Sequence, residues 1–183
     1  MSASKNGGAV IDTPQIDTLQ IDAPQIEVEL SIAPESAVEA IDVMHRAFHE
    51  YAAKGQTSGA MLENARTLTK EISSGVQVAV ARIDGAAVAS VKHHDAGDGT
   101  RYFGRLGVVP EARGRGVASF LVGALRETAR AGGLDGLSCT VRAEEERNIA
   151  LYERLGMDVV ARGERVSRTG AVLKVVEMRD IKV

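Results

Sequence analysis

The sequence predicts a single domain of mixed α/β (α+β) class, with a mostly antiparallel central sheet and helices on both of its faces. Three observations predict this class. Apolar residues make up 44% of the 183 residues, enough to bury a sizeable core. Some segments alternate apolar and polar residues as half-buried strands do, and others repeat apolar residues every three or four positions as amphipathic helices do. In the middle of the chain the two patterns alternate as strand, helix, strand and helix.

The N-terminal segment differs from the rest of the chain. A five-residue repeat begins at Ile11, Ile16 and Ile21 and is echoed from Ile26. Five residues turn a helix position by about 140° and move a strand position to its other face, so these isoleucines cannot share one buried side. We expect 1–25 to be a flexible tail and 26–183 to be the folded domain. The alternative is a tail that docks on the domain or on a partner as a strand or helix.

The first half of the domain is expected to combine two helices with a hairpin. Ser36 and Glu39 have the spacing of a capping box, and Asp84-Gly85 is a strong signal for a two-residue hairpin turn. The patterns predict a strand at 26–30, helices at 36–51 and 61–72, and strands at 76–80 and 88–91.

The second half is expected to alternate strands and helices. Pro110 has no N–H for a strand ladder and ends the strand at 102–109, and Gly132-Gly133 ends the helix that begins at 117. A strand at 137–141, a helix at 144–155 and strands at 159–166 and 171–178 complete the order.

Composition argues against several classes of partner. The net charge is −3, from 22 basic and 25 acidic residues, and aromatic residues are few, so nucleic acid is not an expected partner. No apolar run reaches the roughly 20 residues of a membrane span, and the N-terminus lacks the pattern of an export signal. The single cysteine, Cys139, suits a reducing compartment, and the four histidines lack the spacing of metal ligands. We expect a cytoplasmic protein with no membrane partner and no metal.

One stretch carries a chemical signal, at the turn from the strand 102–109 into the next helix. Backbone N–H groups at a helix start have no helical partner, and the helix dipole makes them attractive to anions. Gly114 and Gly116 let a phosphate approach the main chain, and Arg113 and Arg115 add positive charge. The stretch therefore predicts a phosphate-bearing ligand, with a solvated surface turn as the alternative.

Two well-known phosphate loops do not match this stretch. The spacing Gly114, Gly116, Ser119 lacks the third glycine of a dinucleotide fingerprint, and no Gly-Lys-Ser/Thr follows as in a nucleotide P-loop.

The stretch instead resembles the acyl-CoA motif of the GCN5-related N-acetyltransferase (GNAT) family, whose pattern is Arg or Gln, two residues, Gly, one residue, then Gly or Ala. Residues 113–118 match every specified position. Residues 147–157, with Tyr152 just before Leu155-Gly156-Met157, resemble the second hallmark of the family. The resemblance covers about 26–181.

The resemblance implies roles for individual residues. Acetyl-CoA would be the cosubstrate, and the strands 102–109 and 137–141 would splay apart to admit it. Tyr152 would protonate the leaving thiolate, and Asn148 would supply a polar contact to CoA from the same helix face. The remaining CoA contacts would come from the splayed strand edge and from the main chain at the helix start: Leu106, Gly107, Val108, Arg113, Gly114, Arg115, Gly116, Val117 and Ala118.

The sequence departs from the family pattern at two places. Many relatives have Asn where this chain has Glu145, and many use a carboxylate on the strand that here spans 101–109 without Asp or Glu. The weak candidates for a general base are His49, Glu50, His93 and His94. Three arginines raise the hypothesis of a carboxylate-bearing acceptor: Arg101, Arg105 and Arg142.

The resemblance therefore implies transfer of an acetyl group from acetyl-CoA to a primary amine of a small molecule, by direct attack in a ternary complex. The expected partner is that amine, and the chain is expected to be a monomer or a homodimer. Protein N-termini or lysine side chains are alternative acceptors. A non-catalytic acyl-CoA-binding sensor is the alternative of another class, favoured by the missing carboxylate and opposed by Tyr152.

Overall fold

The computed structural model describes residues 25–53, 58–168 and 170–181. Its strands are β1 (Ile26–Glu29), β2 (Gln77–Ile83), β3 (Ala86–Asp95), β4 (Thr100–Val108), β5 (Gly136–Arg142), β6 (Asp158–Val166) and β7 (Val172–Ile181). Its helices are α1 (Ala37–Ala53), α2 (Ala65–Ser73), α3 (Val117–Ala131) and α4 (Glu146–Arg154), with short 3-10 turns η1 (Pro34–Ser36), η2 (Gly59–Leu62) and η3 (Pro110–Ala112). The tail expected over 1–25 lies outside the described residues, apart from residue 25.

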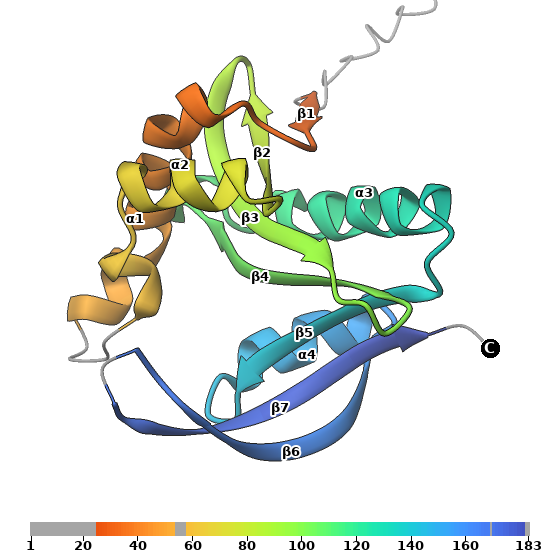
Figure 1. Ribbon diagram of the computed structural model, residues 1–183. Helices are drawn as coiled ribbons and strands as arrows, with labels where there is room; N and C mark the ends of the chain where they lie inside the picture. The colour runs from red at the N-terminus through yellow and green to blue at the C-terminus, as the bar shows by residue number, and fades with distance from the viewer. Residues whose placement is uncertain (1–24, 54–57, 169, 182–183) are drawn as a thin grey trace, which may run out of the picture.

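The strands form one mixed sheet in the order β1-β2-β3-β4-β5-β7-β6 (Figure 1). Neighbouring strands are antiparallel except β4 and β5, which are parallel. The predicted hairpin turn is confirmed, since Asp84 and Gly85 both have positive φ, at 51° and 79°. The mixed α/β class and the mostly antiparallel sheet are confirmed. No helix in the described ranges is long and apolar enough to cross a membrane.

Alternate residues of β2 enter two separate cores. Val78 and Val80 pack with apolar side chains of α1 and α2. Ala79 and Ala81 point to the other face and belong to the cluster that includes the buried residues of α3. The predicted helices on both faces of the sheet are therefore confirmed.

The expected helix at 61–72 is wrong in its first turn, because Asn64 starts a new helix. The Asn64 side chain accepts from the Thr67 N–H at 3.0 Å, and the Thr67 hydroxyl accepts from the Asn64 N–H at 3.2 Å. The capping box expected at Ser36 and Glu39 is also wrong. Both carboxylate oxygens of Glu39 accept instead from the Arg82 guanidinium, 43 residues away.

The strand β4 changes partners along its length. From Thr100 to Phe103 it pairs with Gly136 to Cys139 of β5, and beyond Phe103 it pairs only with β3. A bulge lies at the change, where Arg105 takes a φ of 55° within the strand. Figure 1 shows β4 and β5 side by side at one end and apart at the other. We call this divergence beyond Phe103 and Cys139 the fork.

Candidate active site

The loop from β4 to α3 exposes a helix N-terminus beside the fork. Gly114 and Gly116 have φ of 75° and 80°, which glycine adopts without strain, and a Cβ at either would meet nothing within 4 Å. Gly116 is the N-cap residue of α3 and provides no side-chain hydrogen bond to the first turn. The first N–H groups of this 15-residue helix therefore have no side-chain cap, and the space beside the preceding glycines is open, as an anion-binding helix start requires.

The two arginines of this loop have different surroundings. Arg113 turns back onto α1, where its guanidinium donates to the Ala47 carbonyl at 3.0 Å and to Glu50 at 2.8 Å, and it also donates to the Val108 carbonyl at 3.1 Å. Arg115 is exposed and forms no hydrogen bond or ion pair with any residue that the structure describes. Of the two guanidinium groups, the one on Arg115 is thus free to meet a ligand.

The free edge of β4 lies at Leu106, Gly107 and Val108. Beyond Phe103 the backbone groups of this edge have no strand partner on the β5 side. Gly107 is also where α1 approaches the sheet, since a Cβ there would lie 2.6 Å from Phe48 Cε2 and 2.8 Å from Ala47 Cβ. The packing role of this glycine was not predicted, because Ala47 and Phe48 are about 60 residues away in the sequence.

Tyr152 extends from α4 to the last paired residues of the fork. Its ring meets Phe103 edge-on, with centroids 5.4 Å apart, and only 7% of its surface is exposed. Burial raises the pKa of its hydroxyl well above 10, and the nearby Cys139, Tyr51 and Tyr102 add to this rise. The hydroxyl is therefore protonated at neutral pH, and it forms no hydrogen bond within the described part of the chain.

Asn148 and Glu145 connect α4 to α1 through Tyr51. The Tyr51 hydroxyl donates to Glu145 at 3.2 Å. Burial raises the pKa of Tyr51, the amide of Asn148 opposes the rise, and the charge of Glu145 reinforces it. Asn148 and Glu145 thus face the end of α1, one and two turns before Tyr152.

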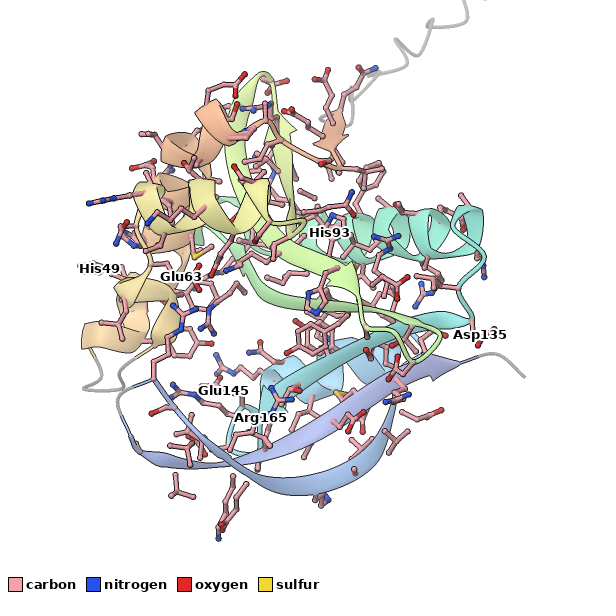
Figure 2. All side chains as sticks on the ribbon, in the orientation of Figure 1. His49, Glu63, His93, Asp135, Glu145 and Arg165 are labelled. Carbon is pink, nitrogen blue, oxygen red and sulfur yellow. The ribbon has the colours of Figure 1, made fainter. Side chains whose placement is uncertain are left out.

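The residues suggested as general bases are separated from one another. His93 is buried, its Nε2 lies 2.8 Å from the Leu30 carbonyl, and burial lowers its pKa, so it is a neutral group of the core. His49 is exposed at the outer edge of the molecule (Figure 2). Glu50 binds Arg113, while the exposed His94 lies beside Tyr102 with ring centroids 5.2 Å apart.

A buried carboxylate, Glu63, was missed by the sequence analysis. It is 3% exposed and accepts hydrogen bonds from Lys92 Nζ at 3.0 Å and from Arg105 Nε at 2.9 Å (Figure 2). Burial alone would raise the pKa of Glu63, but the hydrogen bonds and charges of Lys92 and Arg105 outweigh burial and lower it. Glu63 therefore fixes the segment before α2 to the bulge of β4. No local pattern indicated this role, since its partners are 29 and 42 residues away.

Two adjoining hollows lie along the strands β5, β6 and β7, and we call them together the sheet hollow. Their volumes are about 240 Å³ and 160 Å³, and both are lined by Thr140, Arg165 and Glu177. The smaller one also reaches Tyr102 and Cys139, the residues at the base of the fork. Burial raises the pKa of Cys139 to about 12, so its thiol is not an activated nucleophile.

Possible metal ligands are dispersed. Within residues 25–53, 58–168 and 170–181, no group of three or more His, Cys, Asp or Glu side chains is placed to hold a metal ion.

Known proteins resemble this chain in sequence and in fold. A family model described as "Acetyltransferase (GNAT) family" matches residues 42–157. An acetyltransferase of Yersinia enterocolitica is 36% identical over 91 residues, which are 48% of this chain and 63% of that protein. The chain thus matches less than two thirds of the length of this curated relative.

Among solved structures, a ribosomal-protein-alanine N-acetyltransferase from Brucella melitensis has a TM-score of 0.66 at 19% identity, over 85% of this chain and 99% of that one. An acetyltransferase from Salmonella typhimurium with its cofactor acetyl-CoA has a TM-score of 0.65 at 17% identity, over 85% and 92%. At these identities the likeness shows a shared fold.

Proposed function

The chain belongs to the acetyltransferase (GNAT) family, and on this premise we propose that it transfers an acetyl group from acetyl-CoA to a primary amine of a small molecule. The observation that carries the proposal is the fork, which leaves a strand edge without a partner next to an uncapped helix start. All the groups that the proposal uses lie within 26–183, which we take as the catalytic domain.

The residues of the fork fit acetyl-CoA, which supplies the acetyl group as a thioester. The main chain from Arg113 to Ala118 would hold the pyrophosphate, because the first N–H groups of α3 have no helical partner and the space beside Gly114 and Gly116 is open. The guanidinium of Arg115 would add a charged donor. The free edge of β4 at Leu106, Gly107 and Val108 would pair with the amide groups of the pantetheine arm. Asn148 would supply a polar contact from α4.

The chemistry requires positioning and one proton donor. The amine nitrogen attacks the carbonyl carbon, so a C–N bond forms and the C–S bond breaks. Backbone N–H groups on the free edge of β4 would stabilise the negative charge that develops on the carbonyl oxygen. The Tyr152 hydroxyl would give its proton to the leaving sulfur as the C–S bond breaks. The amine releases its own proton to water through the open side of the sheet hollow, and Tyr152 recovers a proton from the same source.

A small acceptor is supported by the size of the sheet hollow. Hollows of about 240 Å³ and 160 Å³ suit a small molecule with few carbon atoms. The smaller hollow reaches the base of the fork at Tyr102 and Cys139. An acceptor in this hollow and acetyl-CoA on the α3 side would meet at the fork, as a ternary complex requires.

The test is release of free thiol from acetyl-CoA by the full chain, with mass spectrometry of the products. We expect turnover with small primary amines and a product heavier by one acetyl group. Turnover confined to peptides acetylated at their N-terminus or at lysine would replace the small-molecule assignment with the protein-acceptor alternative. Tight binding of acetyl-CoA without turnover of any amine or peptide would instead establish a non-catalytic acyl-CoA sensor.

A further inference from the structure

We infer that the acceptor is an amine that also carries a carboxylate, with its carboxylate bound by Arg165 and its amine bound by Glu177 in the sheet hollow. This inference rests on the proposed function, because it assigns the substrate class of the same site. The inference is carried by Arg165 and by one carboxylate oxygen of Glu177, which accept or donate no hydrogen bond among the described residues. Arg101, Arg105 and Arg179, by contrast, have partners.

Arg165 is the guanidinium shared by both parts of the sheet hollow, whereas Arg162 of the same strand lines only the larger part. Arg165 lies on β6 and has no hydrogen bond or ion pair with any described residue. Figure 2 shows it in the region between the β6–β7 hairpin and β4. A guanidinium in a concave site can donate two parallel hydrogen bonds to a carboxylate, a geometry that an ammonium group cannot reproduce.

The arginines first suggested for this role, Arg101, Arg105 and Arg142, all interact with other residues. Arg105 donates to the buried Glu63, and Arg101 donates to the Gln77 side chain at 2.9 Å and contacts His93. Arg179 lines the hollow but is bound by Glu177 and Asp98, each at 2.7 Å. These pairs leave two guanidinium groups of the hollow with unused donors, Arg165 and Arg162, and of these two Arg165 lines both parts of the hollow.

Glu177 offers the complementary charge. It lies on β7, opposite Thr140 of β5, and its side chain is 40% exposed. Both hydrogen bonds from Arg179 end on the same oxygen, Oε1, at 2.9 Å and 2.7 Å. The other oxygen, Oε2, accepts no hydrogen bond from the residues that the structure describes, so it can accept one from an ammonium group.

The spacing of the two groups suits a short molecule. Glu177 pairs with Ala161 in the sheet, four residues before Arg165 on the same strand, which is about 13 Å of strand at about 3.3 Å per residue. Long side chains from both ends reach into the hollow over a lining of Ala161, Gly163 and Val175. The fork lies at the end of the hollow that holds Tyr102. An amino acid with a short side chain satisfies both charges within this span.

The test compares matched acceptors by thiol release from acetyl-CoA. The panel contains short α- and ω-amino acids, their methyl esters, the amines that lack the carboxylate, and the aminophosphonates of the same length. We expect kcat/KM for the amino acids to exceed that for their esters and simple amines by about 30-fold, mainly through KM. The aminophosphonates test whether a different anion is preferred, and a preference for them would overturn the carboxylate assignment.

Variants locate the selectivity. Arg165→Gln should lower kcat/KM for the amino acid by about 30-fold and leave that for the simple amine unchanged, so that the preference disappears. Arg165→Glu should invert the preference toward diamines of similar length. Glu177→Gln should raise KM for every amine. Lys174→Gln removes a positive charge from the same hairpin at a position that does not line the hollow, and it should change neither preference.

Failure of the inference can be told apart from failure of the proposed function. Equal turnover of amino acids and simple amines, unchanged in Arg165→Gln, would overturn the inference and leave the acetyltransferase assignment intact. No turnover of any amine by a protein that binds acetyl-CoA would overturn both.

Discussion

The two sides of the fork are built in different ways. The side proposed for acetyl-CoA is made of backbone from one continuous stretch, 106–118, with glycines at its turns and the start of α3 at its end. The side proposed for the acceptor is made of side chains from separate strands, among them Thr140, Arg165 and Glu177, and the bulge of β4 next to the fork is held by the side chains of Glu63, Lys92 and Arg105. A backbone site tolerates changes of most side chains, whereas a side-chain site depends on contacts that single substitutions remove. Substitutions on the two sides should therefore act differently.

The largest effect is expected where the bulge of β4 depends on one buried charge. Glu63→Ala leaves Arg105 Nε without its partner and Lys92 with only Glu71. Breaking a buried ion pair costs about 3–5 kcal/mol, which is about 6–20 °C in melting temperature for a chain of this size. Differential scanning calorimetry measures the loss. A change below about 1 kcal/mol would show that the Glu63 pairs do not hold the segment before α2 to the bulge of β4.

The carboxylate of Glu63 also makes the free energy of unfolding depend on pH. The pKa of Glu63 is lower in the folded chain than its ordinary value of 4.5, so its contribution is fully present above that pH and is lost as the pH falls through the folded value. Glu63→Gln, of the same size, lacks this contribution. The stability advantage of the wild type over Glu63→Gln should therefore be constant near pH 7 and shrink below about pH 4.5. Urea unfolding at a series of pH values measures it, and an advantage that does not change with pH would contradict the assignment.

Tyr152 lies at the fork between the two sides, and its side chain is proposed to act as the general acid rather than to bind acetyl-CoA. Tyr152→Phe should lower kcat by about 100-fold, as loss of a general acid does, while the Kd for acetyl-CoA changes by less than about 2-fold. Steady-state kinetics measures kcat, and calorimetric titration measures the Kd for acetyl-CoA separately. Unchanged turnover would rule out the acid role, and equal losses in turnover and affinity would indicate a binding role instead.

Gly107 lies where β4 touches α1. In Gly107→Ala the new Cβ would stand 2.6 Å from the Phe48 ring, so α1 must shift away from β4. Overpacking of this kind costs about 1–3 kcal/mol. Gly123→Ala is the matched control, because Gly123 lies inside α3 with nothing near its Cβ position, and it should gain about 0.5–1 kcal/mol from helix propensity. Equal effects of the two substitutions in thermal unfolding would contradict the close approach of α1.

The smallest effect is expected at Arg113, whose guanidinium binds α1 although its backbone belongs to the side proposed for acetyl-CoA. Arg113→Gln should weaken acetyl-CoA binding by less than about 5-fold, because exposed pairs such as that with Glu50 contribute little. Arg115→Gln removes a free guanidinium and should weaken binding by about 10-fold. If Arg113→Gln were the more damaging change, Arg113 would have to leave α1 and bind the ligand itself.

Features that depend on neighbouring residues could be predicted from the sequence. Asp84-Gly85 indicated a hairpin, and the structure gives both residues the positive φ that the turn needs. Gly114 and Gly116 indicated a turn into a helix start, and they too have positive φ. In each case the chemical reason for the residue lies within a few positions of it, so a local pattern records it.

Features that depend on distant residues could not be predicted. Glu39 has the spacing of a capping-box residue, yet Arg82 from β2 binds it. Glu63 and Arg165 lie in no motif, and their positions become meaningful only when the sheet brings β3, β4 and β7 beside them. Arg105 was considered for the acceptor from its charge alone, and the bulge directs it to Glu63 instead. Tertiary packing, and not the local sequence, thus determines which partners these charged side chains have.

Calorimetric titration of acetyl-CoA into the wild-type chain, Gly116→Ala and Gly116→Glu tests the central claim most directly. Gly116 has a φ of 80°, so Gly116→Ala adds backbone strain of about 1–2 kcal/mol but no charge, and it should bind with reduced affinity. Gly116→Glu adds an anion where the pyrophosphate should lie. We predict micromolar binding by the wild type and a loss of at least about 100-fold in Gly116→Glu beyond that in Gly116→Ala. Equal binding by Gly116→Glu and Gly116→Ala would contradict the placement of acetyl-CoA at the start of α3.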